Sequence, residues 1–373
     1  IDEVNLVACH ISTKLGAKKI ICRLRNTEYS HNNAIVTPSD FNIDKVVFPE
    51  KAAQNEIESL IRQTSAVEIE EFRDGKLILV GINLEQSSPL IGRTVDQIKI
   101  ANPYIPHQLS VIYREDESFV PHQQTVYKKD DFAYFLGKNE DISKIQQMSG
   151  KPAIKVTNVM ILGAGKIGRL LAKSLQTEYD VRIIEKNKNK AKKYSEKLID
   201  TLMLIGDGLD TDFLESENIS DVDCFIAATD SEETNILAGL IVKHYGVKQV
   251  ILHINTTSYL RSVRRIGVDS VLSKNISAVN EVIKIIKSDQ QSLPVCRFDE
   301  IDIESIEIKV SKTSKYIIKK YTIADIPENI SLGAIIRNGK FNIPDKHSEI
   351  YPDDELLLFS KSKNIEIAEN LFI

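Results

Sequence analysis

The chain has 373 residues, more than one hydrophobic core usually organises, so we expect roughly two to four domains. Its 48 basic and 53 acidic residues give a formal net charge of −5, which provides no general attraction to nucleic acid or anionic lipid. No apolar run approaches the roughly 18 residues of a membrane-spanning helix, so we expect neither nucleic-acid binding nor direct membrane insertion.

The first segment, residues 1–62, matches the later half of an α/β unit that occurs in full farther along the chain. For example, Leu15–Ile21 aligns with Tyr245–Ile251. The part of the complete unit from residue 157 to residue 231 has no counterpart before Ile1. We therefore expect an N-terminally truncated fragment, whose first unit has its glycine loop and ribose-binding acid outside this sequence.

The second segment, residues 66–148, is short and strand-rich, and we predict a small α+β module. Two strand patterns, Glu68–Phe72 and Leu77–Ile82, flank a hairpin turn at Arg73–Lys76. The last segment, residues 290–373, has the same character. Further short helices and turns are expected at Thr94–Ile100, Glu115–Glu117, Ile323–Ile326 and Asn338–Gly339. Small modules of this kind commonly serve in sensing or dimerisation.

The third segment contains the most informative motif. An apolar strand leads directly into the loop Gly163-x-Gly165-x-x-Gly168, and a helical pattern follows at once. In dinucleotide-binding folds the first glycine permits a tight turn, the second lets a pyrophosphate approach the helix N-terminus, and the third lets helix and strand pack closely. The next strand ends in Glu185, which can accept hydrogen bonds from the adenine-side ribose. The pattern predicts a nucleotide site.

Apolar strands alternate with helical patterns through the rest of this segment, which predicts a six-stranded, doubly wound parallel sheet. The later strands are expected at 201–205, 223–229, 249–255 and 269–273, and the helices at 186–197, 232–245 and 258–266. Ligands of such sheets bind at the carboxyl ends of the strands, where the strand order switches. This places one loop and four further residues around one crevice. They are Gly163, Ala164, Gly165, Lys166 and Ile167 of the loop, with Glu185, Asp207, Thr229 and Asp230.

A lysine-rich run follows Glu185 and allows two interpretations. Its members are Lys186, Lys188, Lys190, Lys192 and Lys193. A lysine could bind the 2′-phosphate of NADP, but the carboxylate of Glu185 would repel that phosphate. We therefore interpret the run as a solvated helix face.

The segments repeat in the order A-B-A-B, with an α/β unit followed each time by a small α+β module. The expected domains are residues 1–62, 66–148, 155–275 and 290–373.

No acid–base constellation or metal site is expected in the modules. The histidines His107, His122 and His347 are single and are not repeated, and the cysteines Cys9, Cys22, Cys224 and Cys296 are scattered without a C-x-x-C pattern. We interpret the cysteines as reduced core thiols of a cytosolic protein.

The glycine loop with Glu185, the pair Gly206-Asp207 and the run Ala228–Asn235, followed by a small α+β module and duplicated, resemble the TrkA family. Members of this family are cytosolic regulatory subunits of the bacterial Trk potassium-uptake system, built from two tandem RCK units. The resemblance implies NAD binding, with NADH, ATP and ADP open as alternatives, and assembly into a ring beneath a membrane channel. By position, Arg23 matches a nucleotide-contacting arginine of the family, whereas the second unit has His253 there.

The resemblance implies a non-enzymatic regulator that gates potassium transport. Its partners would be a Trk-type potassium-translocating membrane subunit and further copies of the chain, and it would be peripheral at the cytoplasmic face of the membrane. Two alternatives stay open: an NAD-dependent oxidoreductase, or the regulatory part of another potassium channel or antiporter. An oxidoreductase needs an acid–base side chain near the nicotinamide, which neither small module supplies.

Overall fold

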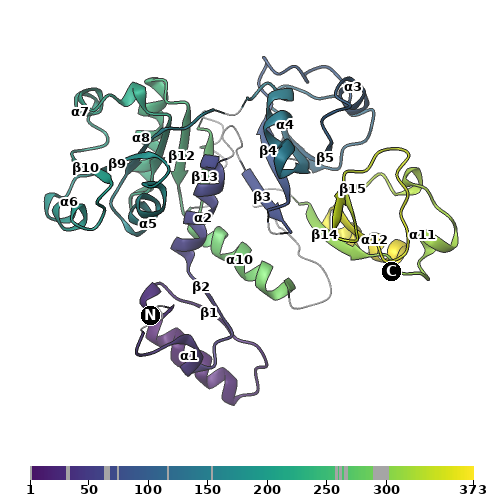
Figure 1. Ribbon diagram of the computed structural model, residues 1–373, viewed down its shortest axis with the longest axis horizontal. Coiled ribbons are helices and arrows are strands. Elements are labelled where there is room, and N and C mark those ends of the chain that lie inside the picture. The colour runs from purple at the N-terminus through teal and green to yellow at the C-terminus, as the bar shows by residue number, and fades with distance from the viewer. Residues whose placement is uncertain are drawn as a thin grey trace. The chain divides into compact units, whose positions relative to one another are not determined.

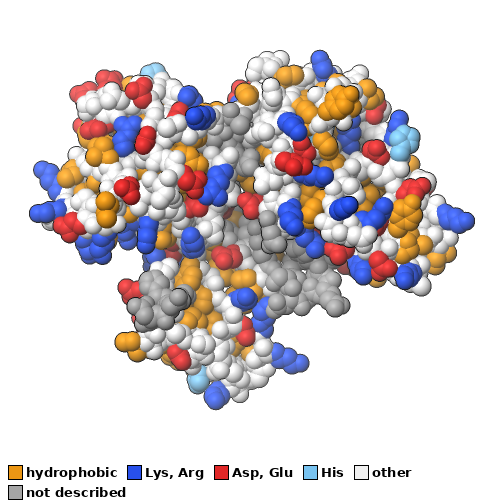
Figure 2. Space-filling model, viewed as in Figure 1, with side chains coloured by type: hydrophobic (Ala, Val, Ile, Leu, Met, Phe, Trp, Pro, Cys, Tyr) orange, Lys and Arg blue, Asp and Glu red, His pale blue; other side chains and the backbone are white. Residues whose placement is uncertain are grey.

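In the computed structural model, the described residues are 2–30, 34–62, 68–73, 75–115, 117–152, 154–256, 259, 263, 268–288 and 302–373. They belong to two compact units (Figure 1). One unit contains Ile1–Thr64 and Ile154–Ile285, and the other contains Ser65–Ala153 and Ile286–Ile373. Acidic and basic side chains are interspersed over the visible surface (Figure 2). Across the described ranges, every helix is too short or too polar to cross a membrane.

A six-stranded parallel sheet forms the centre of the first unit. Its strands are β8 (Asn158–Leu162), β9 (Asp180–Glu185), β10 (Thr201–Ile205), β11 (Cys224–Ala227), β12 (Gln249–His253) and β13 (Ser270–Leu272). They are arranged in the order β10-β9-β8-β11-β12-β13, and the order switches between β8 and β11. The predicted doubly wound sheet is thereby confirmed. The predicted helix at 258–266 lies almost wholly outside the described residues.

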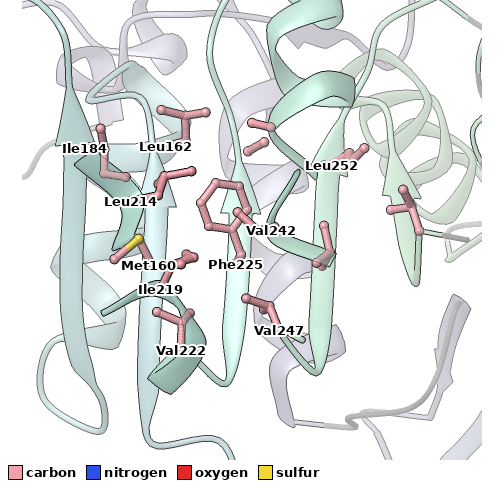
Figure 3. Packing of buried hydrophobic residues seen from close by; sticks show 14 of the residues in the cluster. Met160, Leu162, Ile184, Leu214, Ile219, Val222, Phe225, Val242, Val247 and Leu252 are labelled. Carbon is pink, nitrogen blue, oxygen red and sulfur yellow. The ribbon is translucent and has the colours of Figure 1, made fainter. Parts of the chain in front are cut away.

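Helices cover both faces of this sheet. They are α5 (Lys166–Leu175), α6 (Lys188–Ser195), α7 (Thr211–Ser216), α8 (Glu232–His244) and α10 (Lys274–Ser288). On the face of α7 and α8, Phe225 lies among Met160, Leu214 and Val242 in a continuous apolar core (Figure 3). On the opposite face, α5 approaches β8 so closely that Gly168 lies beside Ile161.

The N-terminal segment reproduces the later part of this fold on a smaller scale. It contains α1 (Asp2–Lys14), β1 (Ile21–Arg23), the 3-10 turns Thr27–Ser30 and Pro38–Phe41, β2 (Lys45–Val47) and α2 (Pro49–Arg62), with β1 and β2 parallel. The side-chain amide of Asn5 donates to the carbonyl of Arg23 at 2.7 Å, and that of Asn235 donates to the carbonyl of His253 at 2.8 Å. The internal repeat therefore extends to individual hydrogen bonds.

Helix α2 packs against the second α/β segment within the same unit. Near its C-terminal end, the carbonyl of Leu60 accepts a hydrogen bond of 3.0 Å from the side chain of Gln249, at the amino end of β12. In the middle, Gln54 donates to Ser174 at the end of α5 over 2.9 Å. The N-terminal end of α2 consequently lies beside the carboxyl ends of the strands.

The second unit contains two antiparallel α+β modules. The first has β3 (Glu68–Phe72), β4 (Leu77–Asn83), α3 (Val95–Ala101), β5 (His107–Arg114), β6 (Glu117–Phe119), β7 (Phe132–Lys138), the 3-10 turn Asn139–Asp141 and α4 (Ile142–Met148). The second has β14 (Glu304–Lys309), α11 (Lys315–Ile318), the 3-10 turn Ile323–Asp325, β15 (Ile330–Arg337), β16 (Lys340–Asn342), β17 (Glu355–Ser360), the 3-10 turn Ser362–Asn364 and α12 (Ile365–Phe372). The three predicted turns, after Phe72, Arg114 and Arg337, all join paired strands.

Each of the two modules contains an equivalent ion pair, in which a partly exposed arginine binds a buried aspartate. Arg114 donates two hydrogen bonds to Asp131 over 2.6 and 2.7 Å, and Arg337 does the same to Asp354 over 2.7 and 2.8 Å. Each aspartate also accepts a backbone N–H from the residue three positions earlier. Irregularities in β5 and β15 fall at matching places in the repeat. The four-domain boundaries predicted from the sequence stay a prediction.

We expect Asp131→Ala to lower the free energy of unfolding by about 2–3 kcal/mol, because it removes the buried carboxylate that accepts hydrogen bonds from Arg114 and from the backbone N–H of Lys128. Urea denaturation followed by circular dichroism measures the change. Lys129→Ala is the control, since it removes only an exposed pair with Asp130 at 3.7 Å and should change stability by less than about 0.5 kcal/mol. If Asp131→Ala and Lys129→Ala unfolded at the same urea concentration, the expected stabilisation by the Arg114–Asp131 pair would be wrong.

Candidate nucleotide-binding site

The glycine loop between β8 and α5 requires glycine at two positions for different reasons. Gly163 has a φ of 102°, in the left-handed region that side chains other than glycine rarely adopt. A Cβ at residue 168 would lie 2.0 Å from the carbonyl oxygen of Gly163, so any larger residue would force α5 away from β8. The loop therefore presents the N-terminus of α5 at the switch in strand order, where its free N–H groups can bind an anion.

A pocket of about 250 Å³ opens beside this loop at the carboxyl ends of the strands. It is lined by Leu162, Gly163, Gly165, Ile184, Glu185, Lys186, Lys190, Gly206, Asp207, Gly208, Thr229, Asp230, Ser231 and Thr234. These residues lie at or just beyond the carboxyl ends of four adjacent strands, β8, β9, β10 and β11. The topology thus brings together segments that are far apart in the sequence.

Glu185 is fixed at one wall of the pocket by three donors. The backbone N–H groups of Ala164 and Asn187 donate to it over 3.1 and 2.9 Å, and the ammonium of Lys190 lies 2.8 Å away. Burial opposes ionisation, but these donors together hold the pKa of Glu185 below its usual value. The carboxylate is therefore charged at neutral pH and can accept hydrogen bonds from ribose hydroxyls.

A second carboxylate, Asp207, lies at the end of β10. The ammonium of Lys186 is 2.6 Å from it, and the backbone N–H of Leu209 donates to it over 3.1 Å. The hydrogen bond from Lys186 is the main reason that the pKa of Asp207 is lowered. Two members of the lysine-rich run thus pair with pocket carboxylates, while Lys188, Lys192 and Lys193 are exposed as expected.

The opposite wall is held by a buried asparagine. Asn235 is fully buried, and its Oδ1 accepts hydrogen bonds from the backbone N–H and the hydroxyl of Thr229, over 3.0 and 2.7 Å. Its Nδ2 donates to the carbonyl of His253 over 2.8 Å. This network links the ends of β11 and β12 and keeps the Thr229–Asp230 turn in position.

The predicted site residues fall into two groups. Gly163, Gly165, Glu185, Asp207, Thr229 and Asp230 line the pocket. Ala164 and Ile167 are buried in the loop, Lys166 forms an ion pair with Glu50 at 3.7 Å, and Arg23 is exposed at the end of β1, outside the pocket lining. Two further contacts were not predicted from the sequence: Lys190 is a partner of Glu185, and Glu50 is a neighbour of the loop.

The histidines and cysteines outside the pocket are the other candidate ligands for a metal ion. In the described ranges, no three His, Cys, Asp or Glu residues come together in a way that could hold a metal ion. His107 is buried in the first α+β module, and burial lowers its pKa to about 4, whereas His122 and His347 are exposed. Cys9, Cys22 and Cys224 are free thiols, and Cys296 lies outside the described residues.

Known proteins are similar to this chain in both sequence and fold. The sequence profile of the TrkA-N domain matches residues 159–274, the segment that carries the pocket. A Trk system potassium uptake protein trkA homolog 1 of Methanosarcina mazei is 31% identical over 338 residues, covering 88% of this chain and 82% of that protein. The chain belongs to the TrkA family. The TrkA protein of Vibrio alginolyticus is 28% identical over 376 residues, covering the whole of this chain and 82% of its own length.

A solved structure shows the same fold at lower sequence identity. The GsuK channel bound to NAD superimposes with a TM-score of 0.55 at 15% identity, covering 99% of this chain and 65% of that one. The predicted fold class, a parallel α/β sheet with small antiparallel modules, is thus confirmed.

We expect Gly165→Asp to abolish nucleotide binding while leaving the protein folded. A Cβ at residue 165 would meet only the carbonyl oxygen of Ala228, at an ordinary 3.5 Å, but the added carboxylate would lie where the loop offers its N–H groups. Calorimetric titration with NAD measures binding, and circular dichroism checks the fold. Gly168→Ala is the contrasting variant, since its clash with Gly163 should impair folding itself. Wild-type affinity in a folded Gly165→Asp protein would refute the site.

Proposed function

We propose that this chain is a regulatory subunit of a potassium-uptake transporter, which binds NAD or a related adenine nucleotide at the second α/β unit. The observation that carries the proposal is the pocket formed by the glycine loop and the anchored carboxylate of Glu185. Membership of the TrkA family supports the link to potassium uptake, because its relatives are named for that system.

The residues of the pocket match the chemical groups of a dinucleotide. The loop from Gly163 to Ile167 would hold the pyrophosphate on backbone N–H groups at the start of α5. Glu185 would accept hydrogen bonds from the adenine-side ribose, and the turn at Thr229 and Asp230 would border the nucleotide on the β11 side. Among NAD, NADH, ATP and ADP we propose NAD as the ligand. The bound nucleotide would act as an effector, with no chemical step on it.

Regulation requires that the nucleotide bind two arrangements of the protein with different affinity. Helix α2 gives a route for this coupling, because Glu50 at its start pairs with Lys166 in the glycine loop at 3.7 Å. A phosphate on the loop would compete with Glu50 for the Lys166 ammonium. Nucleotide occupancy would then change the position of the first α/β segment relative to the second.

We propose that the protein works as a homo-oligomer bound to a Trk-type potassium-translocating subunit at the cytoplasmic face of the membrane. Two covalently linked units per chain suit a symmetric ring, because a tandem repeat resembles a dimer within one polypeptide. Localisation would come from protein contact with the transporter.

Potassium uptake tests this proposal. In cells whose own regulatory subunit is deleted, the wild-type protein with its cognate transporter should restore growth at low potassium, and Gly165→Asp should not. In membrane fractionation, the protein should sediment with membranes only when the transporter is present. Equal growth with wild type and Gly165→Asp, or membrane association without the transporter, would refute the proposal.

A second test addresses catalysis. Incubated with NAD and a broad panel of alcohols and hydroxy acids, the protein should produce no absorbance of the reduced nicotinamide. The expectation follows from the pocket lining, in which no histidine or tyrosine occurs and both lysines, Lys186 and Lys190, pair with the carboxylates of Asp207 and Glu185. Sustained NADH formation with any substrate would favour the oxidoreductase alternative.

A further inference from the structure

A second group of polar side chains lies at the carboxyl end of β12, across the glycine loop from Glu185. In the sheet, β8 and β11 separate β9, which carries Glu185, from β12. Side chains alternate along a strand, so His253 points to the same face as Gln249, whose side chain contacts Leu60 of α2. His253 is only 4% exposed, and its Nε2 has no hydrogen-bond partner among the described residues.

Glu50 approaches this position from the other α/β segment. It is the second residue of α2, is 3% exposed, and its Oε2 accepts no hydrogen bond from any described residue. Two cations form only long ion pairs with Glu50. The Nε atom of Arg25 lies 3.5 Å from its Oε1, and the Nζ atom of Lys166 lies 3.7 Å from its Oε2. A buried carboxylate oxygen without a donor is costly, so the site is suited to a ligand that supplies one.

Asn255 adds a third polar group. It follows His253 by two positions, and the chain between them still pairs with the next strand, since the N–H of Ile254 donates to Leu272 over 2.9 Å. The Oδ1 atom of Asn255 is buried and, within the described ranges, has no hydrogen-bond partner. By strand alternation Asn255 falls on the same face as His253, while Glu50 lies beside Lys166 at the start of α5. Both residues thus have an acceptor oxygen without a donor from the described part of the chain.

The chemistry of this group favours a ligand that supplies hydrogen-bond donors and carries no negative charge. Burial lowers the pKa of His253 to about 4, so its imidazole is neutral at neutral pH. The ribose hydroxyls and the carboxamide of a second nucleoside provide donors for two acceptor oxygens. An ionised terminal phosphate provides only acceptors, and its charge would be repelled by the carboxylate of Glu50.

We propose that Glu50, His253 and Asn255 form a subsite that recognises the second nucleoside of a dinucleotide and disfavours the terminal phosphate of a nucleoside triphosphate. The proposal rests on the nucleotide site proposed above and deepens it. The first α/β segment supplies Glu50, so the nucleotide site of the second segment is incomplete without the first.

The internal repeat supports a subsite that occurs once in the chain. The second residue of α10, which corresponds to Glu50 in α2, is Asn275. The position that corresponds to His253 is Arg23, which is exposed. Among the described residues, the buried carboxylate of Glu50 and the imidazole of His253 are thus not repeated at the two corresponding positions.

Calorimetry with NAD, ADP and ATP tests the subsite, with a chelator present so that no divalent cation bridges phosphate and carboxylate. ADP reports the adenine half alone, and the ratio of NAD to ADP affinity reports the subsite. This ratio should fall about tenfold in Glu50→Ala and in His253→Ala. In Glu50→Gln, which keeps the shape but removes the charge, ATP affinity should rise relative to ADP.

Glu58→Gln is the matched control, because Glu58 lies on the same helix but contacts Ser174 at the far end of α5. It should leave the NAD-to-ADP ratio unchanged. An unchanged ratio in both Glu50→Ala and His253→Ala, or an equal fall in Glu58→Gln, would overturn the subsite. Wild-type protein that binds NAD no more tightly than ADP would also overturn it while leaving the adenine site intact. If the wild-type chain bound neither, the proposed function itself would fail.

Discussion

The packing of helix α2 on the second α/β segment is the contact on which the rest of the structure depends. A parallel sheet needs helices on both faces, and the face of β12 that carries Gln249 is closed by a helix from the other segment. The same helix contacts Ser174 at the end of α5, whose start forms the glycine loop. Helix α5 therefore belongs both to the pocket and to the contact with α2. A displacement of its C-terminal end at Ser174 would also displace the glycine loop at its start.

The internal repeat separates what the fold requires from what a ligand requires. The framework bonds recur in both copies: Asn5 and Asn235 brace the following strand, and Arg114 and Arg337 bind an aspartate in the small modules. The corresponding residues at the starts of α2 and α10 differ, being Glu50 and Asn275. Duplication thus kept the hydrogen bonds that hold strands in place and allowed the side chains at strand ends to diverge.

Much of the fold was predictable, because strand and helix periodicity, the three glycines and the acid at residue 185 are local signals. The place of the pocket followed from the rule that parallel strands carry ligands at their carboxyl ends. Glu50 could not be found in this way, since it lies on an amphipathic helix of another segment and only packing brings it to Lys166. The pairing of Lys190 with Glu185 was missed because it depends on the turn that begins α6, where Asn187 caps the helix.

The alternation of segments has a consequence for biosynthesis. The chain passes between its two compact units three times, at residues 64, 153 and 285, so neither unit is a continuous stretch of sequence. During translation at roughly 5–20 residues per second, α2 emerges on the order of ten seconds or more before the strands that it covers. During that time the strands of the second segment cannot yet cover its apolar face, which includes Ile57, Leu60 and Ile61. The period before residue 285 leaves the ribosome is thus a window for capture by chaperones or attack by proteases.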